Sequence, residues 1–236
     1  MVLRFINKPI LDLTADEALL EISAVLGKKI KLEKITGRIA DSDGDYVKDG
    51  VIDHDKLNDL YNNGKYVEEY IATLAVTSLT NRAADLFWLI DRSNGRVLEY
   101  GCGTSTHGIA CAQRGCEVHA VDVSDKMIEI SKKRYKLRDL SVIIHGPDAD
   151  LPDNYFDVIL CTDVLEHVPD PVSLLHKFIR CMKIGGVAHL HCSKMKNYIK
   201  GHLPGAIDAW FSEGVEILNK NFTKISPHNY RLKCKQ

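Results

Sequence analysis

The sequence has no long uninterrupted run of apolar residues, although 45% of its 236 residues are hydrophobic. A helix that crosses a membrane needs about 20 consecutive apolar residues, and the apolar runs here are much shorter. The first residues, from Met1 to Leu13, mix charged and polar side chains with apolar ones and lack the pattern of a secretory signal. We therefore expect a protein without a signal peptide or membrane span.

The sequence also lacks a Cys-x-x-Cys pair and an excess of charge of either sign. Its seven cysteines are scattered and odd in number, unlike a secreted disulfide framework or a zinc site. The 31 basic and 32 acidic residues leave a net charge of −1 at pH 7, so no overall field attracts nucleic acid or an anionic membrane. We expect a cytoplasmic protein with reduced thiols and a small-molecule or protein partner, without a nucleic-acid partner.

The first part of the chain has the pattern of helices. Thr14 and Glu17 have the spacing of a capping box, and apolar residues follow them at helical intervals. Further helical patterns lie between residues 55 and 90. A chain of this length can bury one sizeable core with an appendage. We expect residues 1–63 to form a helical cap and residues 64–236 to form the main domain.

From residue 95 onward, expected strands and helices alternate, which is typical of a parallel sheet. The expected strands are Arg96–Tyr100, Glu117–Val121, Ser141–His145, Phe156–Cys161 and Val187–Cys192. The expected helices are 105–114, 125–136, 171–182 and 212–220, and a terminal hairpin joins 222–226 to 230–235. Together they predict an α/β fold with a doubly wound, seven-stranded, mostly parallel Rossmann-like sheet. Ligands of such sheets bind at the carboxyl ends of the strands.

A glycine-rich turn follows the first expected strand directly. Gly101 and Gly103 permit a tight turn and a close backbone approach by a ligand, and the next helix start offers free amides. Asp122 stands at the end of the second strand, about 20 residues further on, where a carboxylate can accept hydrogen bonds from ribose hydroxyls. The combination predicts a nucleoside ligand.

The residues around this turn separate two kinds of nucleoside ligand. A dinucleotide-binding loop would have its third glycine at position 106, which is Thr106 here. Glu99, just before the turn, would repel a pyrophosphate but suits a cationic ligand. The stretch resembles the first motif of the class I S-adenosylmethionine-dependent methyltransferases, an acidic residue, any residue and Gly-x-Gly. Here it runs from Glu99 to Gly103, with Ser105 where these enzymes usually have another glycine.

The resemblance covers about residues 95–186, and its later motifs follow in order. It implies S-adenosylmethionine as the cofactor and S-adenosylhomocysteine as the product. Asp122 would bind the ribose, and Asp148 or its neighbouring amide would bind the adenine amino group. Arg82, on the helix before the first strand, is one of the cofactor-binding residues that the resemblance implies, and the alternative for it is an exposed surface position. The cofactor-binding residues that the resemblance implies are Glu99, Gly101, Cys102, Gly103, Asp122, Val123, Met127, Asp148, Ala149, Cys161, Thr162 and Arg82.

The loop after the fourth expected strand carries the candidate catalytic residues. Asp163, Glu166 and His167 stand at i, i+3 and i+4, so one helical turn would bring their side chains together. Such a cluster could act as a general base or hold a magnesium ion. The loop resembles that of the ubiquinone-biosynthesis O-methyltransferases and the small-RNA end methyltransferases, where Glu-x-x-Glu-His holds a metal. Asp163 replaces the first glutamate, and the alternative is that Glu166 and His167 only orient the loop.

Other ring-bearing side chains near the expected site have two interpretations. His189 and His191 share one face of the fifth expected strand. We expect packing rather than catalysis for both, although His191 lies near the functional edge. Four aromatic residues before the first strand could cover the site, but their helical spacing is more typical of a core, and they are Tyr66, Tyr70, Phe87 and Trp88.

These patterns favour a methyltransferase that uses S-adenosylmethionine and methylates an oxygen or nitrogen of a small molecule. One alternative is an RNA or protein methyltransferase, although the Asn/Asp-Pro-Pro-Tyr/Phe motif typical of amino methyltransferases is absent after the fourth strand. Another is a non-catalytic relative that binds the cofactor and regulates a partner. The identity of the acceptor and the oligomeric state stay open at this point.

Overall fold

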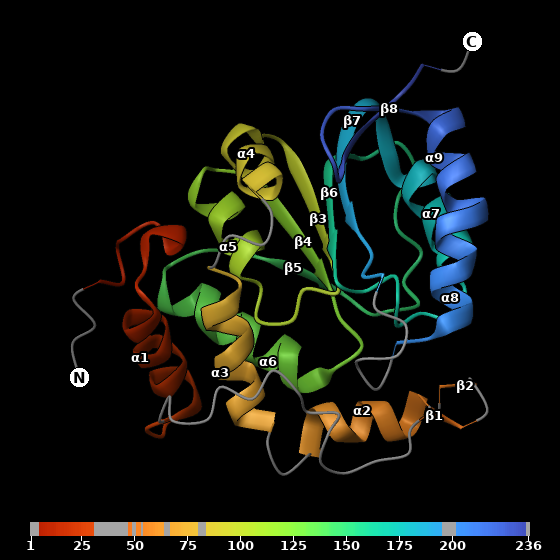
Figure 1. The fold of residues 1–236 in the computed structure, drawn as a ribbon. Helices are drawn as coiled ribbons and strands as arrows, with labels where there is room; N and C mark the ends of the chain where they lie inside the picture. Colours follow the sequence, from red (N-terminus) through yellow and green to blue (C-terminus); the bar gives the residue numbers. More distant parts are fainter. Residues whose placement is uncertain are drawn as a thin grey trace.

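A computed structural model describes residues 5–30, 47–48, 51–52, 54–63, 67–79, 84–194 and 202–234. Its centre is a seven-stranded sheet with the order β5-β4-β3-β6-β7-β9-β8 (Figure 1). The bounds are β3 Arg96–Tyr100, β4 Glu117–Val121, β5 Ile143–His145, β6 Phe156–Thr162, β7 Met182–His191, β8 Phe222–Lys224 and β9 Asn229–Leu232. Strands β3 to β7 pair in parallel, whereas β9 runs antiparallel to β7 and to β8. The predicted doubly wound, mostly parallel sheet is confirmed.

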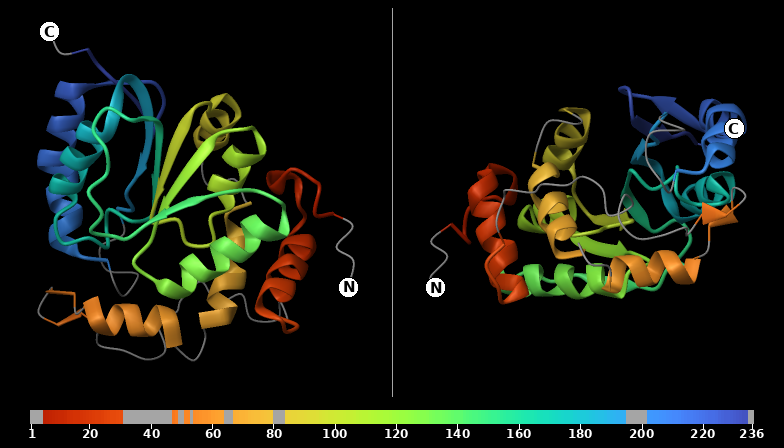
Figure 2. Two further views of the ribbon diagram at one scale, coloured as in Figure 1. Left: turned by 180° about the vertical axis from the view of Figure 1, so that it is seen from behind. Right: turned by 60° about the horizontal axis from the view of Figure 1, so that its bottom comes forward.

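Helices flank the sheet on both faces and extend beyond its edge (Figure 2). They are α1 Ala15–Leu26, α2 His54–Asn63, α3 Val67–Thr77, α4 Ala84–Arg92, α5 Thr106–Gln113, α6 Asp125–Leu137, α7 Pro171–Cys181, α8 Pro204–Ala209 and α9 Val215–Asn221. A 3-10 turn, Ile10–Asp12, precedes α1, and β1 Val47–Lys48 pairs with β2 Val51–Ile52. Within these described ranges, the helices are too short or too polar to cross a bilayer.

Alternate residues of the central strands face two different cores. Leu98 and Ile159 belong to the core beneath α7, the π-helical turn Trp210–Gly214 and α9. Val97 and Val158, one position earlier in each strand, belong to the core beneath α4 and α5. Because successive side chains of a strand point to opposite faces, apolar residues at every position require helices on both faces. This arrangement leaves the strand ends as the place for a site.

Two elements begin well before their expected bounds. Strand β7 begins at Met182, not at Val187, and continues through Gly185 and Gly186. A bulge in its pairing with β6 accommodates this start, and a Cβ atom at Gly186 would lie 3.0 Å from the Asp157 carbonyl oxygen. The expected helix 212–220 is instead the last part of a longer helical run from Pro204 to Asn221. Local periodicity did not indicate either extension, since both depend on pairing and packing.

The N-terminal helix α1 is joined to the main domain by buried charges. Its N-cap is the predicted capping box of Thr14 and Glu17. Glu21, fully buried, accepts a 3.0 Å hydrogen bond from the Arg134 Nε atom of α6 and also pairs with Arg138. Apolar side chains of α1, α3 and α6 form a third core beside these ion pairs. The division at residue 63 stays a prediction.

We expect Glu21→Ala to lower the free energy of unfolding by about 3–5 kcal/mol, because it leaves the buried Arg134 without its carboxylate. Urea unfolding followed by circular dichroism measures this loss. Glu129→Ala is the matched control, since Glu129 makes exposed ion pairs with Lys126 and Lys133, for which a loss below about 1 kcal/mol is expected. Equal losses for the two variants would contradict the structural importance of the buried pair.

Candidate functional site

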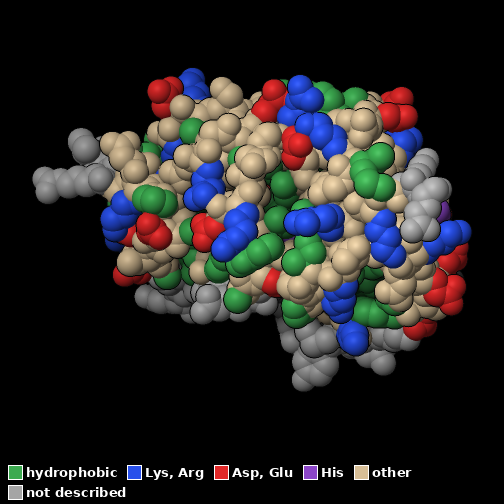
Figure 3. Space-filling model, turned by 90° about the horizontal axis from the view of Figure 1, so that it is seen from above, with side chains coloured by type: hydrophobic (Ala, Val, Ile, Leu, Met, Phe, Trp, Pro, Cys, Tyr) green, Lys and Arg blue, Asp and Glu red, His purple; other side chains and the backbone are tan. Residues whose placement is uncertain are grey.

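A cleft of about 1110 Å³ opens at the carboxyl ends of the parallel strands. Its walls come from the loops after β3, β4 and β6, the end of β7, the β8–β9 turn and helices α2 to α5. In Figure 1 this edge of the sheet points downward, toward α2. The opposite end of the molecule has acidic and basic side chains intermixed, without a large patch of one sign (Figure 3). The cleft therefore lies where ligands of doubly wound sheets bind.

The glycine loop after β3 is held between β4 and the loop after β6. The amides of Gly101 and Cys102 both donate to the Val121 carbonyl oxygen, at 2.8 and 2.9 Å. Gly101 has φ 70°, and a Cβ atom there would lie 2.2 Å from the Val164 side chain. Only glycine fits this contact without displacing the neighbouring loop, so the first glycine of the motif has a steric reason.

Asp122, directly after β4, binds the glycine loop through its carboxylate. One of its oxygens accepts from the Gly103 amide at 2.7 Å and the other from the Ser124 amide at 2.9 Å. Burial raises the pKa of Asp122. A carboxylate offers about four acceptor positions, so both oxygens retain capacity for the hydroxyls of a ligand. The neighbouring Val123 is exposed and Met127 is buried, and both line the cleft.

Glu99 lies beneath the glycine loop with little exposure to solvent. Its carboxylate accepts a hydrogen bond from the Ser105 hydroxyl, and the His107 Nδ1 atom lies 4.0 Å away. Burial raises the pKa of Glu99 to about 7. Ser105, in the place of the usual third glycine, has a left-handed backbone with φ 53°. Near neutral pH a cationic ligand would stabilise the ionised form of this carboxylate.

Arg134 supports the glycine loop from behind, a role that the sequence did not indicate. Its Nη1 atom donates to the Thr104 carbonyl oxygen at 2.5 Å and to the Thr106 hydroxyl at 2.9 Å. The same guanidinium binds Glu21 of α1. The N-terminal helix and the loop are thus connected through one buried cation.

Helix α2 packs beside α6 at the edge of the sheet where the parallel strands end (Figures 1 and 2). The Asn62 side-chain oxygen accepts from the Ser124 hydroxyl at 3.0 Å and from the Lys126 amide at 2.9 Å. The Tyr61 ring lies 5.8 Å from that of Tyr70, centroid to centroid, and both rings line the cleft. Tyr70 is among the aromatic residues expected near the site, whereas Tyr61 is not, since nothing in the local sequence shows that α2 reaches this loop.

Of the remaining predicted cofactor residues, some line the cleft and others do not. Thr162 lines it, whereas Cys161 is fully buried in the sheet. Asp148 and Ala149 lie in the turn after β5, from which Pro147 lines the cleft instead. Phe87 also contributes to the lining, whereas Trp88 is 39% exposed and packs against Arg92. Arg82 and Tyr66 lie outside the described residues.

The loop after β6 does not form the expected helical turn that would bring Asp163, Glu166 and His167 together. Asp163 has a left-handed backbone with φ 55°, and residues 165–167 form a turn. The Asp163 carboxylate instead accepts a 2.8 Å hydrogen bond from the His191 Nδ1 atom of β7. The three candidates are therefore divided between two groups of side chains.

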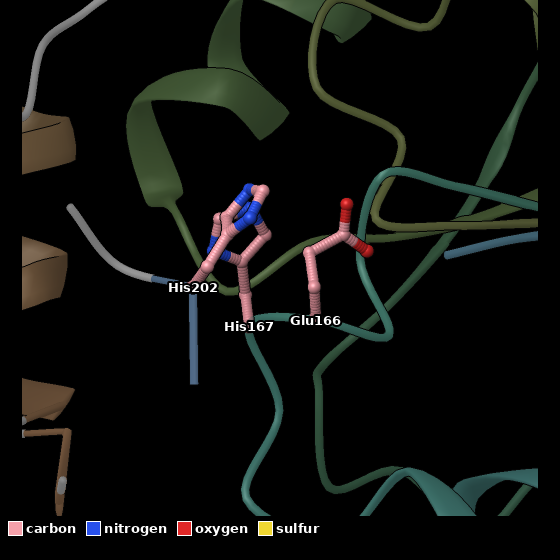
Figure 4. A group of neighbouring side chains, drawn as sticks. All are labelled: Glu166, His167 and His202. Carbon is pink, nitrogen blue, oxygen red and sulfur yellow. The ribbon is translucent and has the colours of Figure 1, made fainter. Parts of the chain in front are cut away.

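Glu166 and His167 gather with His202, a residue that the sequence analysis missed (Figure 4). One potential ligand atom from each side chain lies within 4.8 Å of the others, and the two imidazole rings are 4.8 Å apart. Glu166 is buried, its Oε1 atom accepts from the Ser193 amide at 3.2 Å, and its Oε2 atom has no hydrogen-bond partner within the described ranges. Burial raises the pKa of Glu166 to about 7.

Two imidazoles and one carboxylate are donors of the kind that zinc, manganese and other transition metals prefer. Magnesium prefers oxygen ligands in octahedral geometry. The expected magnesium set of Asp163, Glu166 and His167 thus differs from the set that the structure brings together. No short-range spacing connects His202 to this loop, because it follows β7 and reaches Glu166 only through the fold, its neighbour Leu203 donating to the Glu166 carbonyl oxygen at 2.8 Å.

We expect Glu99 to make a contribution to the stability that falls as the pH rises from about 4.5 to about 7, opposite in sign to the contributions of His107 and His189, whose pKa values burial lowers to about 4. The unfolded chain releases this proton near 4.5, whereas the folded chain keeps it up to about 7. The folded state therefore binds more protons in this window, and each pH unit costs about 1.4 kcal/mol for one such group. Glu99→Gln, which can still accept from Ser105, should remove this contribution, so that the stability of the variant relative to wild type rises with pH in urea unfolding at pH 5 to 8.

Glu129→Gln is the control for this pH dependence, because Glu129 is exposed and lies outside the cleft. Its stability profile should keep the wild-type slope. A Glu99→Gln profile with the same slope as wild type would show that the buried Glu99 carboxyl is ionised throughout this range.

Comparisons with known proteins agree with this architecture. Residues 98–190 match the family model of a methyltransferase domain. The chain is 32% identical over 112 residues to a ubiquinone biosynthesis O-methyltransferase of Alkalilimnicola ehrlichii, covering 46% of this chain and 44% of the relative. It is 28% identical over 133 residues to the Vibrio cholerae protein of the same name, covering 52% and 53%. The chain thus spans about half the length of these relatives.

Among solved structures, the chain is similar to a protein from Pyrococcus horikoshii, with a TM-score of 0.46 and 17% identity over 77% of this chain and 97% of that one. It is also similar to an S-adenosylmethionine-dependent methyltransferase from Aquifex aeolicus, with a TM-score of 0.44 and 15% identity over 63% and 87% of the two chains.

Proposed function

We propose that this chain, which carries a class I S-adenosylmethionine-dependent methyltransferase domain, binds S-adenosylmethionine and transfers its methyl group to an oxygen atom of a small molecule. The observation that carries the proposal is the glycine loop with the Asp122 carboxylate bound to its Gly103 amide, at the mouth of a large cleft. This loop permits close approach by a nucleoside, and the Glu99 carboxylate beneath it would repel a pyrophosphate.

The cofactor would lie along the ends of β4, β3 and β6. Asp122 would accept hydrogen bonds from the ribose hydroxyls, and Val123 and Met127 would border the adenine. The sulfonium and ammonium groups would lie on the side of Glu99, whose raised pKa makes it responsive to a nearby positive charge. Thr162 would face the methionine part.

Methyl transfer is an in-line displacement at a carbon already activated by positive sulfur. The protein must align the acceptor atom with the methyl group and take up the acceptor proton. Oxygen is favoured as the acceptor atom because the curated relatives are named O-methyltransferases. The cleft is large enough for a second small molecule beside the cofactor, since pockets for one drug-sized ligand occupy about 300–1,000 Å³.

The group of Glu166, His167 and His202 is proposed to hold a divalent transition-metal ion at the acceptor side of the cleft. The buried Glu166 oxygen without a hydrogen-bond partner among the described residues supports this assignment, because such an atom is costly unless it binds a ligand or a proton. A bound ion would supply positive charge that favours an ionised acceptor oxygen.

We expect Asp122→Ala to weaken S-adenosylmethionine binding by about 10- to 100-fold, which corresponds to the loss of charge-assisted hydrogen bonds to the ribose. Isothermal titration calorimetry with S-adenosylmethionine and S-adenosylhomocysteine measures the change. Asp125→Ala is the matched control, because Asp125 is an exposed carboxylate three positions away and outside the cleft lining. Unchanged affinity in Asp122→Ala would contradict the proposed ribose position.

For the metal group, calorimetric titration of the purified protein with zinc, manganese and magnesium chlorides should give binding of zinc and manganese and much weaker binding of magnesium. His202→Ala should weaken zinc binding by about tenfold or more, because one of three ligands is lost. His176→Ala, on the exposed face of α7, should leave it unchanged. Magnesium binding that is stronger than zinc binding, or unaffected by His202→Ala, would contradict the proposed ligand set.

A further inference from the structure

Further histidines line the cleft on the side of β7 and the β8–β9 turn. His189 and His191 come from β7, and His228 comes from the turn. The His228 ring packs edge to face against His191 and His189, with centroids 4.9 and 5.7 Å away. This group lies beyond Thr162, away from the Asp122 end that the proposed nucleoside occupies.

These histidines differ in their surroundings. His189 is fully buried, its Nδ1 atom bonds the Asn229 side chain at 2.8 Å, and burial lowers its pKa to about 4. Burial also lowers the pKa of His228. His191 is hydrogen-bonded to the Asp163 carboxylate, and 32% of its side chain is exposed. It is thus the member of this group with both an ionic partner and access to the cleft.

The fold brings Asp163 and His191 together through the pairing of adjacent parallel strands. Thr162 of β6 is the register partner of His191, so the next residue, Asp163, leaves the sheet beside it. The left-handed backbone at Asp163 turns the chain at this point, and aspartate tolerates that conformation better than most residues. Because a carboxylate only accepts, the Nδ1 atom of His191 donates, and the lone pair of the neutral ring is on Nε2.

We propose that His191 is the group that accepts the proton of the methyl acceptor, and that Asp163 is a positioning residue that holds its ring and stabilises the imidazolium. This inference rests on the proposed methyl transfer. It assigns the proton acceptor to β7, whereas the sequence pattern pointed to His167. His167 packs against His202 and belongs to the metal group.

The proposed methyl transfer needs no reactant besides the acceptor and S-adenosylmethionine. The lone pair of the acceptor oxygen forms a bond to the methyl carbon while the bond from that carbon to sulfur breaks, and its electron pair stays on sulfur as the neutral thioether of S-adenosylhomocysteine. The hydroxyl proton moves to the Nε2 atom of His191. The resulting imidazolium is paired with the Asp163 carboxylate, as in other histidine–carboxylate dyads.

Several titratable groups surround His191 and contribute to its pH dependence. His189 lies on the same strand, Asp163 on the loop after β6, and His228 on the β8–β9 turn. Glu166 is close enough for its charge to interact with that of His191. Asp85 of α4 accepts from the His228 amide at 2.9 Å. The charge of Asp163 also interacts with His107 of α5, and that of Lys224 with His228. The Asp163 charge is the one in direct contact, so its removal should have the largest effect.

The test compares His191→Gln, Asp163→Asn, the double variant and the control His176→Gln. Methyl transfer from radiolabelled S-adenosylmethionine to 3,4-dihydroxybenzoate, a catechol, is measured from pH 5 to 9, and cofactor affinity is measured by calorimetry. We expect unchanged cofactor affinity and a kcat that falls by about 10²- to 10⁴-fold in His191→Gln, with loss of the rise of kcat between acid and neutral pH. Asp163→Asn should lose less, and the double variant should be no worse than His191→Gln.

A second readout needs no methyl acceptor. In proton and nitrogen NMR spectra, the His191 ring should show a strongly deshielded Nδ1 proton and a titration midpoint that moves to lower pH in Asp163→Asn. An unchanged midpoint in Asp163→Asn, or wild-type kcat and pH profile in His191→Gln, would overturn the dyad. Wild-type protein that does not bind S-adenosylmethionine would instead contradict the proposed function, and the NMR titration decides the dyad independently of that result.

Discussion

The buried guanidinium of Arg134 is the interaction on which the rest of the site depends. It joins Glu21 of the N-terminal helix to Thr104 and Thr106 of the glycine loop and α5. Burying a cation is costly without an opposite charge and acceptors, so these contacts link the three segments, although the Nη2 atom has no hydrogen-bond partner among the described residues. The loop conformation, and with it the hydrogen bond from Gly103 to Asp122, is therefore linked to the packing of α1 on α6.

The loop after β6 contributes residues to both side-chain groups of the cleft. Its first residue, Asp163, binds His191 of β7, and a few positions later Glu166 and His167 meet His202. The same loop contacts the glycine loop through Val164, whose side chain occupies the space that a side chain at Gly101 would need. The glycine loop, the proposed proton acceptor and the proposed metal group thus all contact or include residues of this loop. Substitutions in this loop should be interpreted with all three in mind.

Burial gives two carboxyls of the cleft a similar response to pH. Glu99 and Glu166 each have a pKa of about 7 because they are taken out of water. Each can therefore change its charge near neutrality when a cation arrives. Glu99 lies beneath the proposed cofactor and Glu166 belongs to the proposed metal group, so binding of a charged ligand at either place would change the pH dependence of the stability.

The sequence by itself determined the sheet, the glycine turn and the position of Asp122. These features depend on the alternation of strands and helices along the chain, on the freedom of glycine and on the known place of ligands at the ends of parallel strands, which are all general rules that local patterns reveal. Only the tertiary structure decided the partners of Glu21, Asp163 and His202. Each partner is far away in the sequence, and its approach depends on how helices and loops pack around the sheet. The pattern at Asp163, Glu166 and His167 predicted one cluster, but the turn after β6 divides it because strand pairing places His191 beside Asp163.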